Sequence, residues 1–447
     1  MNLQLFTSKT LLAAAALITG SAVVATSSFA EKLVIISPHR KSIQEEYIPA
    51  FKAWYKETHK QDVEVDWIDQ GGTSDDIRFI RAKFAKNPKS ADVDIFWGGG
   101  TPTYVELDKD GLLDKYSLPK ALEKEVPAEC AGVPLYNKGR TWFASAISSF
   151  GVFYNKKLLK MEGTAEPKTW DDLTDPKFLN QITLADPRRS GSANSLNTII
   201  LQGEGWEKGW QTLTKIAGNT RTFTHSSSDP IKAIVAGDAA ASMAIDFYAL
   251  AKIGDLGADN LGFVLPAGQT ILDPDPIAIV KGAPNKQLAG IFIEYVLSVP
   301  AQKLLMLPKG SPGGPVKESL GRLAINTKAY EETEGKRINA MNPFKEKTFL
   351  KLDIEKAGRM KRAFDDLLGA IHIDTHTELK AAWAAVVKRG SKADEVAALG
   401  KPFVAEADLL ALSDKWADDV FRNKQINAWV EEARKRYQAI ANGQKAG

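Results

Sequence analysis

Short apolar strands alternate with amphipathic helices through the first half of the chain, and this alternation constrains the fold more than any other feature. Strand patterns at residues 33–37, 63–68 and 93–97 are separated by helical spacing of apolar residues at 43–55 and 77–84. Strands that alternate with helices form a mostly parallel sheet with helices on its faces. We therefore expect an α/β fold.

The same alternation returns in the middle of the chain, with strand patterns at 145–154, 182–185, 240–245 and 277–280. A chain of 447 residues is too long for one hydrophobic core. We expect residues 31–146 and 270–325 to form lobe 1 and residues 147–269 to form lobe 2. Residues 326–447 have amphipathic helical spacing and should form a helical extension. Two lobes joined by crossing strands would bind a ligand at their interface.

Loops of small and polar residues follow each of the first three strands. The candidate ligand-binding residues in these loops are Ser37, His39, Gly72, Thr73, Ser74, Gly100 and Thr101. Because the carboxyl ends of parallel strands meet at one edge of a sheet, the three loops should line one crevice. Any one of them alone could equally be an ordinary turn with an N-capping residue. Their succession favours a binding site.

A second candidate site is the turn after the strand at 182–185. It contains Arg188 and Arg189, followed by Ser190, Gly191 and Ser192 before helical spacing resumes. A helix N-terminus attracts anions, and an arginine adds a planar two-pronged donor for phosphate or carboxylate. The alternative is a capped strand-to-helix turn with solvated arginines. The similar loops after three strands of lobe 1 favour the interpretation as an anion site.

Four further polar residues in the second lobe are candidate ligand contacts. Ser226 precedes a short apolar helix at 231–235, where it would either contact the ligand or belong to an ordinary N-cap. Ser148, Asp246 and Tyr248 lie in or after strand patterns and could bind hydroxyl groups of a ligand. Asp273 and Asp275 are ambiguous, because they could equally be turn formers beside Pro274 and Pro276.

The N-terminal 30 residues have the pattern of a cleavable signal peptide. Lys9 supplies a positive charge, residues 11–18 are apolar, and Ser28-Phe29-Ala30 ends in a small-x-small cleavage pattern. We expect cleavage after Ala30 and export to the periplasm. Cys130 is the single cysteine, which excludes a disulfide framework. The near balance of 58 basic and 55 acidic residues argues against binding to nucleic acid.

The chain lacks the common catalytic motifs, including the G-x-x-x-x-G-K-S/T phosphate loop, the G-x-S-x-G elbow and H-E-x-x-H. The cluster His372-Ile373-Asp374-Thr375-His376 has the composition of a metal site, but we interpret it as a solvated turn between two helices. A hydrolase is therefore the weakest functional hypothesis. We expect neither a cofactor nor a catalytic residue.

Several segments together resemble a known family. They are the run ADPRRSGSA at 185–193, GWEKGW at 205–210, AIDFY at 244–248, and DPIAIVKGAP at 275–284 with YVLS at 295–298. They resemble the type 2 periplasmic solute-binding proteins, in the branch that serves importers of ferric iron and of phosphorylated compounds. The helical region, with RMKRAFD at 359–365, is similar to that of phosphoglycerate transport regulatory proteins.

The resemblance implies a two-lobed periplasmic binding protein with a C-terminal helical extension, and an inner-membrane ABC permease as its partner. The iron-binding branch implies two adjacent tyrosines, whereas this chain has Phe247 and Tyr248. We therefore expect a small anionic, phosphorylated organic solute. One alternative is a ferric receptor that uses Tyr248 together with a bound anion. Another is an accessory protein that presents its ligand state to a membrane sensor kinase through the helical extension.

Overall fold

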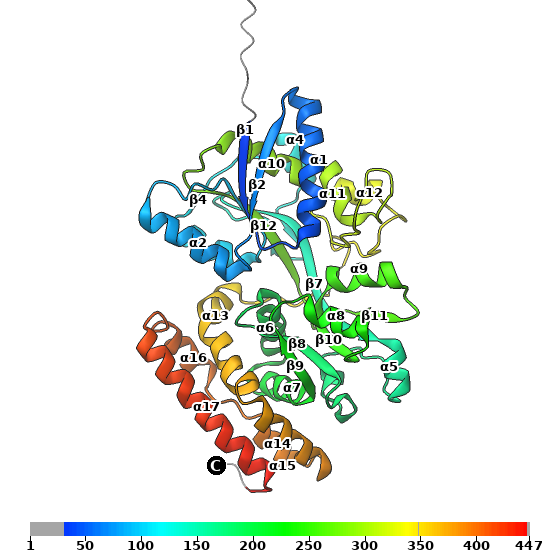
Figure 1. The fold of residues 1–447 in the computed structure, drawn as a ribbon, viewed down its shortest axis with the longest axis vertical. Coiled ribbons are helices and arrows are strands. Elements are labelled where there is room, and N and C mark those ends of the chain that lie inside the picture. Colours follow the sequence, from blue (N-terminus) through cyan, green and yellow to red (C-terminus); the bar gives the residue numbers. More distant parts are fainter. Residues whose placement is uncertain (1–30, 347, 445–447) are drawn as a thin grey trace, which may run out of the picture.

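The computed structural model describes residues 31–346 and 348–444, so the expected signal peptide lies outside the described residues. Two α/β lobes and a set of C-terminal helices are visible in Figure 1. The expected fold class is confirmed. One mixed sheet of strand order β2-β1-β3-β12-β7-β10-β8-β9 runs through both lobes, and two further strands pair with its central members, β4 with β12 and β11 with β7.

Lobe 1 begins with the expected alternation of strands and helices. Its elements are β1 (Glu31–Ile36), α1 (Lys41–His59), β2 (Val63–Ile68), α2 (Thr73–Lys86), β3 (Ile95–Trp97), α3 (Thr101–Lys109), β4 (Leu113–Asp114), α4 (Lys120–Glu125), β5 (Glu129–Cys130) and β6 (Val133–Pro134). β1 pairs in parallel with both β2 and β3. Apolar clusters cover both faces of this sheet, which explains why β3 is apolar throughout.

Lobe 2 has the same alternation. It contains α5 (Lys156–Met161), the 3₁₀ turns η1 (Asp171–Thr174) and η2 (Pro176–Phe178), β8 (Ile182–Ala185), α6 (Gly191–Glu204), α7 (Trp206–Asn219), β9 (Thr220–Thr224), α8 (Asp229–Ala236), β10 (Ala241–Ile245), α9 (Asp246–Leu256) and β11 (Leu261–Val264). Trp210 lies on α7 and is buried in the lobe 2 core, in agreement with its helical spacing.

Two long strands connect the lobes. β7 (Phe143–Asn155) pairs with β12 (Leu272–Val280) up to Ser149, and with β10 from Phe150 onward. The chain therefore passes from one lobe to the other within a continuous hydrogen-bonded ladder. Such paired strands form a natural hinge, because a small change in their twist changes the angle between the lobes.

After β12 the chain returns to lobe 1 through α10 (Lys286–Leu297), α11 (Val299–Met306) and α12 (Thr327–Glu332). α10 and α11 together have the length and apolar composition of a membrane span. However, the two helices meet at an angle of 53°, and both contribute to the lobe 1 core. No single helix in the described ranges is long and apolar enough to cross a membrane.

The C-terminal helices follow: α13 (Ile354–Leu368), the π-helical turn η3 (Gly369–Ile373), α14 (His376–Lys388), α15 (Ala393–Leu399), α16 (Glu406–Ser413) and α17 (Asp419–Ala441). Their apolar faces form one continuous core with lobe 2, in which Trp210 and Leu213 share a cluster with Phe364, Trp383 and Tyr437. Tyr330 and Phe344 instead pack on lobe 1. The elements from α13 onward thus share the lobe 2 core, whereas Tyr330 and Phe344 belong to the lobe 1 core.

Candidate functional site

A cleft of about 210 Å³ lies between the lobes, and both lobes contribute to its walls. The loops that follow β1, β2 and β3 come together on the lobe 1 side, while the N-terminal ends of α6 and α9 face them from lobe 2. Eleven of the sixteen expected site residues line this cleft: His39, Gly72, Thr73, Gly100, Ser148, Arg189, Ser190, Gly191, Ser192, Ser226 and Tyr248.

Three of the other expected residues lie behind the cleft wall. The Ser37 hydroxyl is 3.0 Å from His39 Nδ1, and the Thr101 hydroxyl donates to the Pro274 carbonyl at 3.1 Å. Asp246 is fully buried, and it accepts hydrogen bonds from the backbone N–H and the hydroxyl of Ser149. These three residues position the wall and do not themselves line the cleft. Ser74 also lies outside the cleft lining.

Arg188 does not line the cleft, and this differs from our expectation. Its Nε and Nη2 atoms donate to Asp186, and its Nη1 atom donates to both carboxylate oxygens of Asp374, at 3.0 and 3.1 Å. Its guanidinium also packs against Gly369, where a Cβ atom would come within 2.7 Å of it. Because two carboxylates already engage its donors, Arg188 joins lobe 2 to η3 and is not available to a ligand.

The cleft wall contains a buried ion pair, between Arg322 and Asp275, that we did not predict from the sequence. Arg322 is 4% exposed, and its Nη2 atom donates to Asp275 Oδ2 at 2.5 Å and to the Ser148 hydroxyl at 3.3 Å. His39 Nε2 lies 2.7 Å from the same Asp275 oxygen. Burial raises the pKa of Asp275, but Arg322 and His39 outweigh burial and hold that pKa well below its ordinary value. Asp275 is therefore a carboxylate at neutral pH.

Three buried guanidinium nitrogen atoms of cleft-lining arginines have no hydrogen-bond partner in the described part of the chain. They are Nε of Arg322 and both Nε and Nη2 of Arg40. Arg40 is held in place by Glu318, which accepts from its Nη1 atom at 3.3 Å. The ring of Phe247 lies beside both guanidinium groups, at 4.3 Å from Arg322 and 5.7 Å from Arg40. Buried donors without partners are costly, so these groups are suited to an anionic ligand.

Helix N-termini add to the positive potential of the cleft. The N-cap residues of α1, α2 and α3 are Arg40, Gly72 and Gly100, which all line the cleft, and none of the three provides a capping side chain. The first backbone N–H groups of α1 and α2 remain available to an anion, whereas in α3 the Thr101 N–H bonds to Asp273 and Pro102 has no N–H. A glycine run, residues 98–100, precedes α3. Glycine is needed at position 98 because a Cβ atom there would lie only 2.8 Å from the His39 ring.

One carboxyl group moderates this positive potential. Asp273 lines the cleft beside Asp275, and its Oδ1 atom is 3.4 Å from the Thr101 hydroxyl. Burial and the neighbouring Asp275 raise the pKa of Asp273 to about 7. Near neutral pH this group can therefore accept or donate a hydrogen bond to a ligand hydroxyl.

The donor set around Tyr248 is poorly suited to a ferric ion. Burial raises the pKa of Tyr248, which disfavours the phenolate form that iron requires. The Arg40 guanidinium lies 5.4 Å from the Tyr248 ring, and its charge would repel a cation. Among the described residues, no group of three or more His, Cys, Asp and Glu is placed to hold a metal ion.

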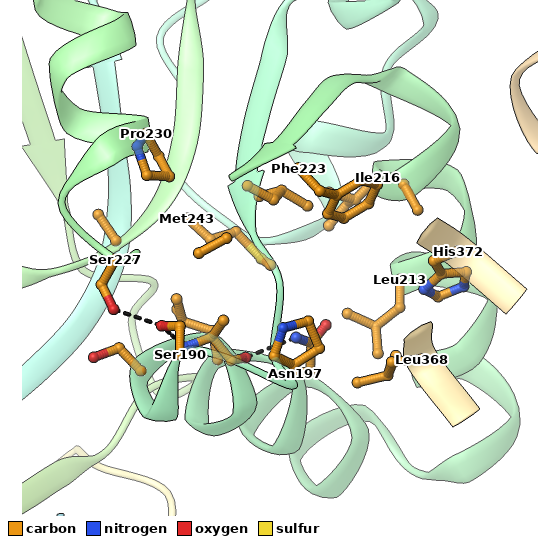
Figure 2. Close-up of a pocket in the computed structure, with 18 of the residues that line it drawn as sticks. Ser190, Asn197, Leu213, Ile216, Phe223, Ser227, Pro230, Met243, Leu368 and His372 are labelled. Carbon is orange, nitrogen blue, oxygen red and sulfur yellow. Dashed lines mark hydrogen bonds between the residues drawn. The ribbon is translucent and has the colours of Figure 1, made fainter. Parts of the chain in front are cut away.

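The His372–His376 segment forms the turn between α13 and α14, and it is buried at His372, whereas we expected a solvated turn. Its two histidines and its aspartate have separate partners: His372 contacts Thr214, Asp374 contacts Arg188, and His376 contacts the Ala217 carbonyl. Figure 2 shows the apolar pocket of about 30 Å³ at this seam, where Leu368 and His372 of the C-terminal helices face Leu213 and Met243. This small pocket adjoins the cleft, and both are lined by Ser190, Ser192, Ser227 and Ile245.

Comparison with known proteins gives matches over much of the chain. The family model described as bacterial extracellular solute-binding protein matches residues 104–328. The phosphoglycerate transport regulatory protein PgtC of Salmonella typhimurium is 30% identical over 200 residues, which are 45% of this chain and 47% of that protein. The match thus spans about half the length of this relative.

Solved structures match a larger part of the chain. The periplasmic binding protein AfuA from Actinobacillus pleuropneumoniae, solved with exogenous fructose-6-phosphate bound, has a TM-score of 0.63 at 23% identity, covering 77% of this chain and 98% of that one. The apo ferric ion-binding protein A of Pasteurella haemolytica has a TM-score of 0.57 at 19% identity, covering 76% of this chain and 97% of that one. At these identities the likeness supports the fold alone.

Proposed function

Because the family match covers half of its residues, the chain belongs to the bacterial extracellular solute-binding proteins, and we propose that it is a periplasmic receptor for a small anionic, phosphorylated organic solute. In this proposal the receptor delivers its solute to an inner-membrane ABC permease. The relatives include a transport regulatory protein, an iron uptake protein and a periplasmic binding protein, and we propose no catalytic step for this chain.

The observation that carries the proposal is the set of buried guanidinium donors without a hydrogen-bond partner in the described chain, on the cleft-lining residues Arg40 and Arg322. A phosphate group offers several oxygen atoms, so it can accept from both arginines and from a helix N-terminus at once. Each charge-assisted hydrogen bond contributes about 1.5–3 kcal/mol. A monovalent carboxylate has only two oxygens, and it would leave more of these donors without partners.

The rest of the solute would lie between the lobes. Ser148, Ser226 and Tyr248 line the cleft with hydroxyl groups, and Asp273 adds a carboxyl group. Their spread over both lobes means that the solute contacts all of them only when the lobes are closed. Rotation about β7 and β12 would then couple solute binding to the closed shape that a permease recognises.

A ferric receptor is the second candidate, and its support is the fold shared with ferric ion-binding proteins. His39 and Tyr248 are the cleft residues that could contribute donor atoms. His39 is already engaged by Ser37 and Asp275, and Arg40 lies beside Tyr248. Ferric binding through a phenolate gives a visible charge-transfer band, so an absorption spectrum after iron loading tests this candidate directly.

Native mass spectrometry of the protein purified from its own periplasm tests the proposed function. We expect an added mass that fragments to a phosphate ion, and we expect the same compound to raise the melting temperature of the ligand-free protein. A co-purified solute without an anionic group would contradict the proposal. So would a panel of organic phosphates that leaves the melting temperature unchanged.

A further inference from the structure

A second cavity of about 220 Å³, which we call the rear chamber, adjoins the interlobe cleft. The two cavities share six lining residues: Pro102, Asn194, Ser195, Asp273, Pro274 and Lys361. One side of the chamber is formed by α3 and by Val133 and Pro134 of lobe 1, and another side by α6 of lobe 2. Strand β12 lies between them.

The C-terminal region supplies the remaining wall. Residues 350–352 and one face of α13, formed by Ile354, Ala357 and Lys361, complete the lining. α13 lies at the boundary between the lobes, beside α6 (Figure 1). Without these residues the chamber would be an open groove. The C-terminal helices are therefore part of the ligand-binding region and are not a separate appendage.

Hydrogen bonds fix this wall against the lobes. The Leu350 backbone N–H donates to the Thr270 carbonyl at 2.8 Å, and Gln202 exchanges two hydrogen bonds with the backbone of Asp353. Asp365 accepts from Asn194 at 2.6 Å and from Lys361 at 2.8 Å. These hydrogen bonds attach the wall both to the segment just before β12 and to α6, so the wall is preorganised for a ligand.

The lining of the rear chamber is mainly apolar. Ten of its eighteen residues are apolar: Pro102, Val133, Pro134, Ile271, Leu272, Pro274, Leu350, Leu352, Ile354 and Ala357. At the junction with the cleft, Asp365 neutralises the ammonium group of Lys361, and Asp273 disfavours a second anion. An apolar cavity of about 150 Å³ accepts a benzene molecule, so the chamber has room for a ring.

We propose that the rear chamber is a second compartment of the ligand site, which holds an uncharged ring or short apolar chain attached to the anionic group in the cleft. This inference rests on the proposed function. It specifies the solute class as an organic phosphate with an apolar substituent. Transfer of the substituent from water into the chamber supplies affinity that the anion contacts alone do not provide.

Calorimetric titration of the full mature chain with two simple esters tests the inference. Phenyl phosphate and methyl phosphate carry the same anionic group, so they differ only in the substituent that enters the chamber. We expect phenyl phosphate to bind at least about tenfold more tightly than methyl phosphate. Equal affinities would overturn the inference while leaving the proposed function intact. If neither ester binds, the proposed function fails, and the inference fails with it.

Variants locate the extra affinity. A357F places a ring in the chamber from α13 and should remove the preference for phenyl phosphate without changing the affinity for methyl phosphate. V133F blocks the chamber from lobe 1 and should do the same, which keeps the test available if A357F fails to fold. E355F is the matched control, because Glu355 is exposed on the same helix. The inference would be overturned if A357F and V133F lost affinity for both esters equally. It would also be overturned if the control E355F lost the preference for phenyl phosphate.

Discussion

The two lobes present different kinds of surface to the cleft. In lobe 1, α1 and α3 begin without a capping side chain, and Arg40 and Arg322 keep N–H groups without partners in the described structure. In lobe 2, Ser190 caps α6, and the donors of Arg188 are engaged by Asp186 and Asp374.

The arginines of the two lobes serve different purposes: one attaches the C-terminal helices, and the other lines the cleft. Arg188 lies in the most conspicuous basic turn of the sequence, yet it attaches the C-terminal helices. Arg322 has no local motif around it, yet it lines the cleft and retains a buried donor without a partner among the described residues. The carboxylates that surround an arginine in space, and not its neighbours in sequence, decide whether it remains available to a ligand. We therefore expect lobe 1 to dominate anion binding.

The largest expected effect concerns the dependence of lobe 2 on the C-terminal helices. Trp383 is 2% exposed, packs against Gly218, and donates its indole N–H to Asn219 at 2.6 Å. W383A should lower the free energy of unfolding by about 3–5 kcal/mol, as measured by urea denaturation. V420A is the control, since Val420 is 80% exposed and should tolerate the change. A small effect of W383A would mean that lobe 2 is stable without these helices.

A second prediction tests the lobe 1 side of the comparison. R40A removes the unpartnered donors of Arg40, and the loss of one charge-assisted hydrogen bond should lower the affinity for an organic phosphate by about 1.5–3 kcal/mol, or roughly 10- to 150-fold. Calorimetric titration measures the change. The free energy of unfolding of the R40A variant should change little, because the Glu318 side chain, which accepts a hydrogen bond from Arg40, is 36% exposed. R322A is a less useful probe, because it would leave the buried Asp275 without its arginine partner.

The complementary result is expected in lobe 2. R188A leaves the buried Asp186 without its partner, so unfolding should become easier by about 1–3 kcal/mol while the anion affinity stays unchanged. The neighbouring R189A provides the control, since Arg189 is exposed and its removal should leave stability unaffected. A marked loss of anion affinity in R188A, with normal stability, would reverse the assignment of the two arginines.

The smallest expected effect is a dependence of anion binding on pH. The pKa of Asp273 is raised to about 7, so this carboxyl group is neutral below that pH and repels an anion above it. Sulfate keeps its charge between pH 6 and 8, so its affinity should rise by about threefold as the pH falls across this range. D273N should flatten this dependence. Persistence of the full dependence in D273N would point to another group, such as Asp246, whose burial raises its pKa to about 6.

Local patterns were sufficient to predict the elements that form the cleft. The expected strand at 63–68 coincides with β2, and the expected strand at 182–185 coincides with β8. Since parallel strands end at a common edge, the loop residues His39, Thr73 and Gly100 all line the cleft, and their contact with a ligand stays a prediction. This part of the site follows from chain topology, which the alternation of apolar periods reveals.

The remaining site residues depend on contacts that no local pattern encodes. Arg322 meets Asp275 across 47 positions and His39 across 283, while Arg188 meets Asp374 across 186. Helical periodicity identified the C-terminal helices but not the surface that they cover, because an apolar face does not specify its partner. Their shared core with lobe 2 and the wall that α13 adds to the rear chamber became apparent only in three dimensions.

The central claim is that the guanidinium groups of Arg40 and Arg322, in lobe 1, bind the anion. A crystal structure of the mature chain with tungstate tests it directly, because the anomalous signal of tungsten locates the anion without ambiguity. We predict one strong peak within hydrogen-bond reach of Arg40 and Arg322, beside the N-terminus of α1. A principal peak at the Arg188–Arg189 turn, with none near Arg40 and Arg322, would contradict the account.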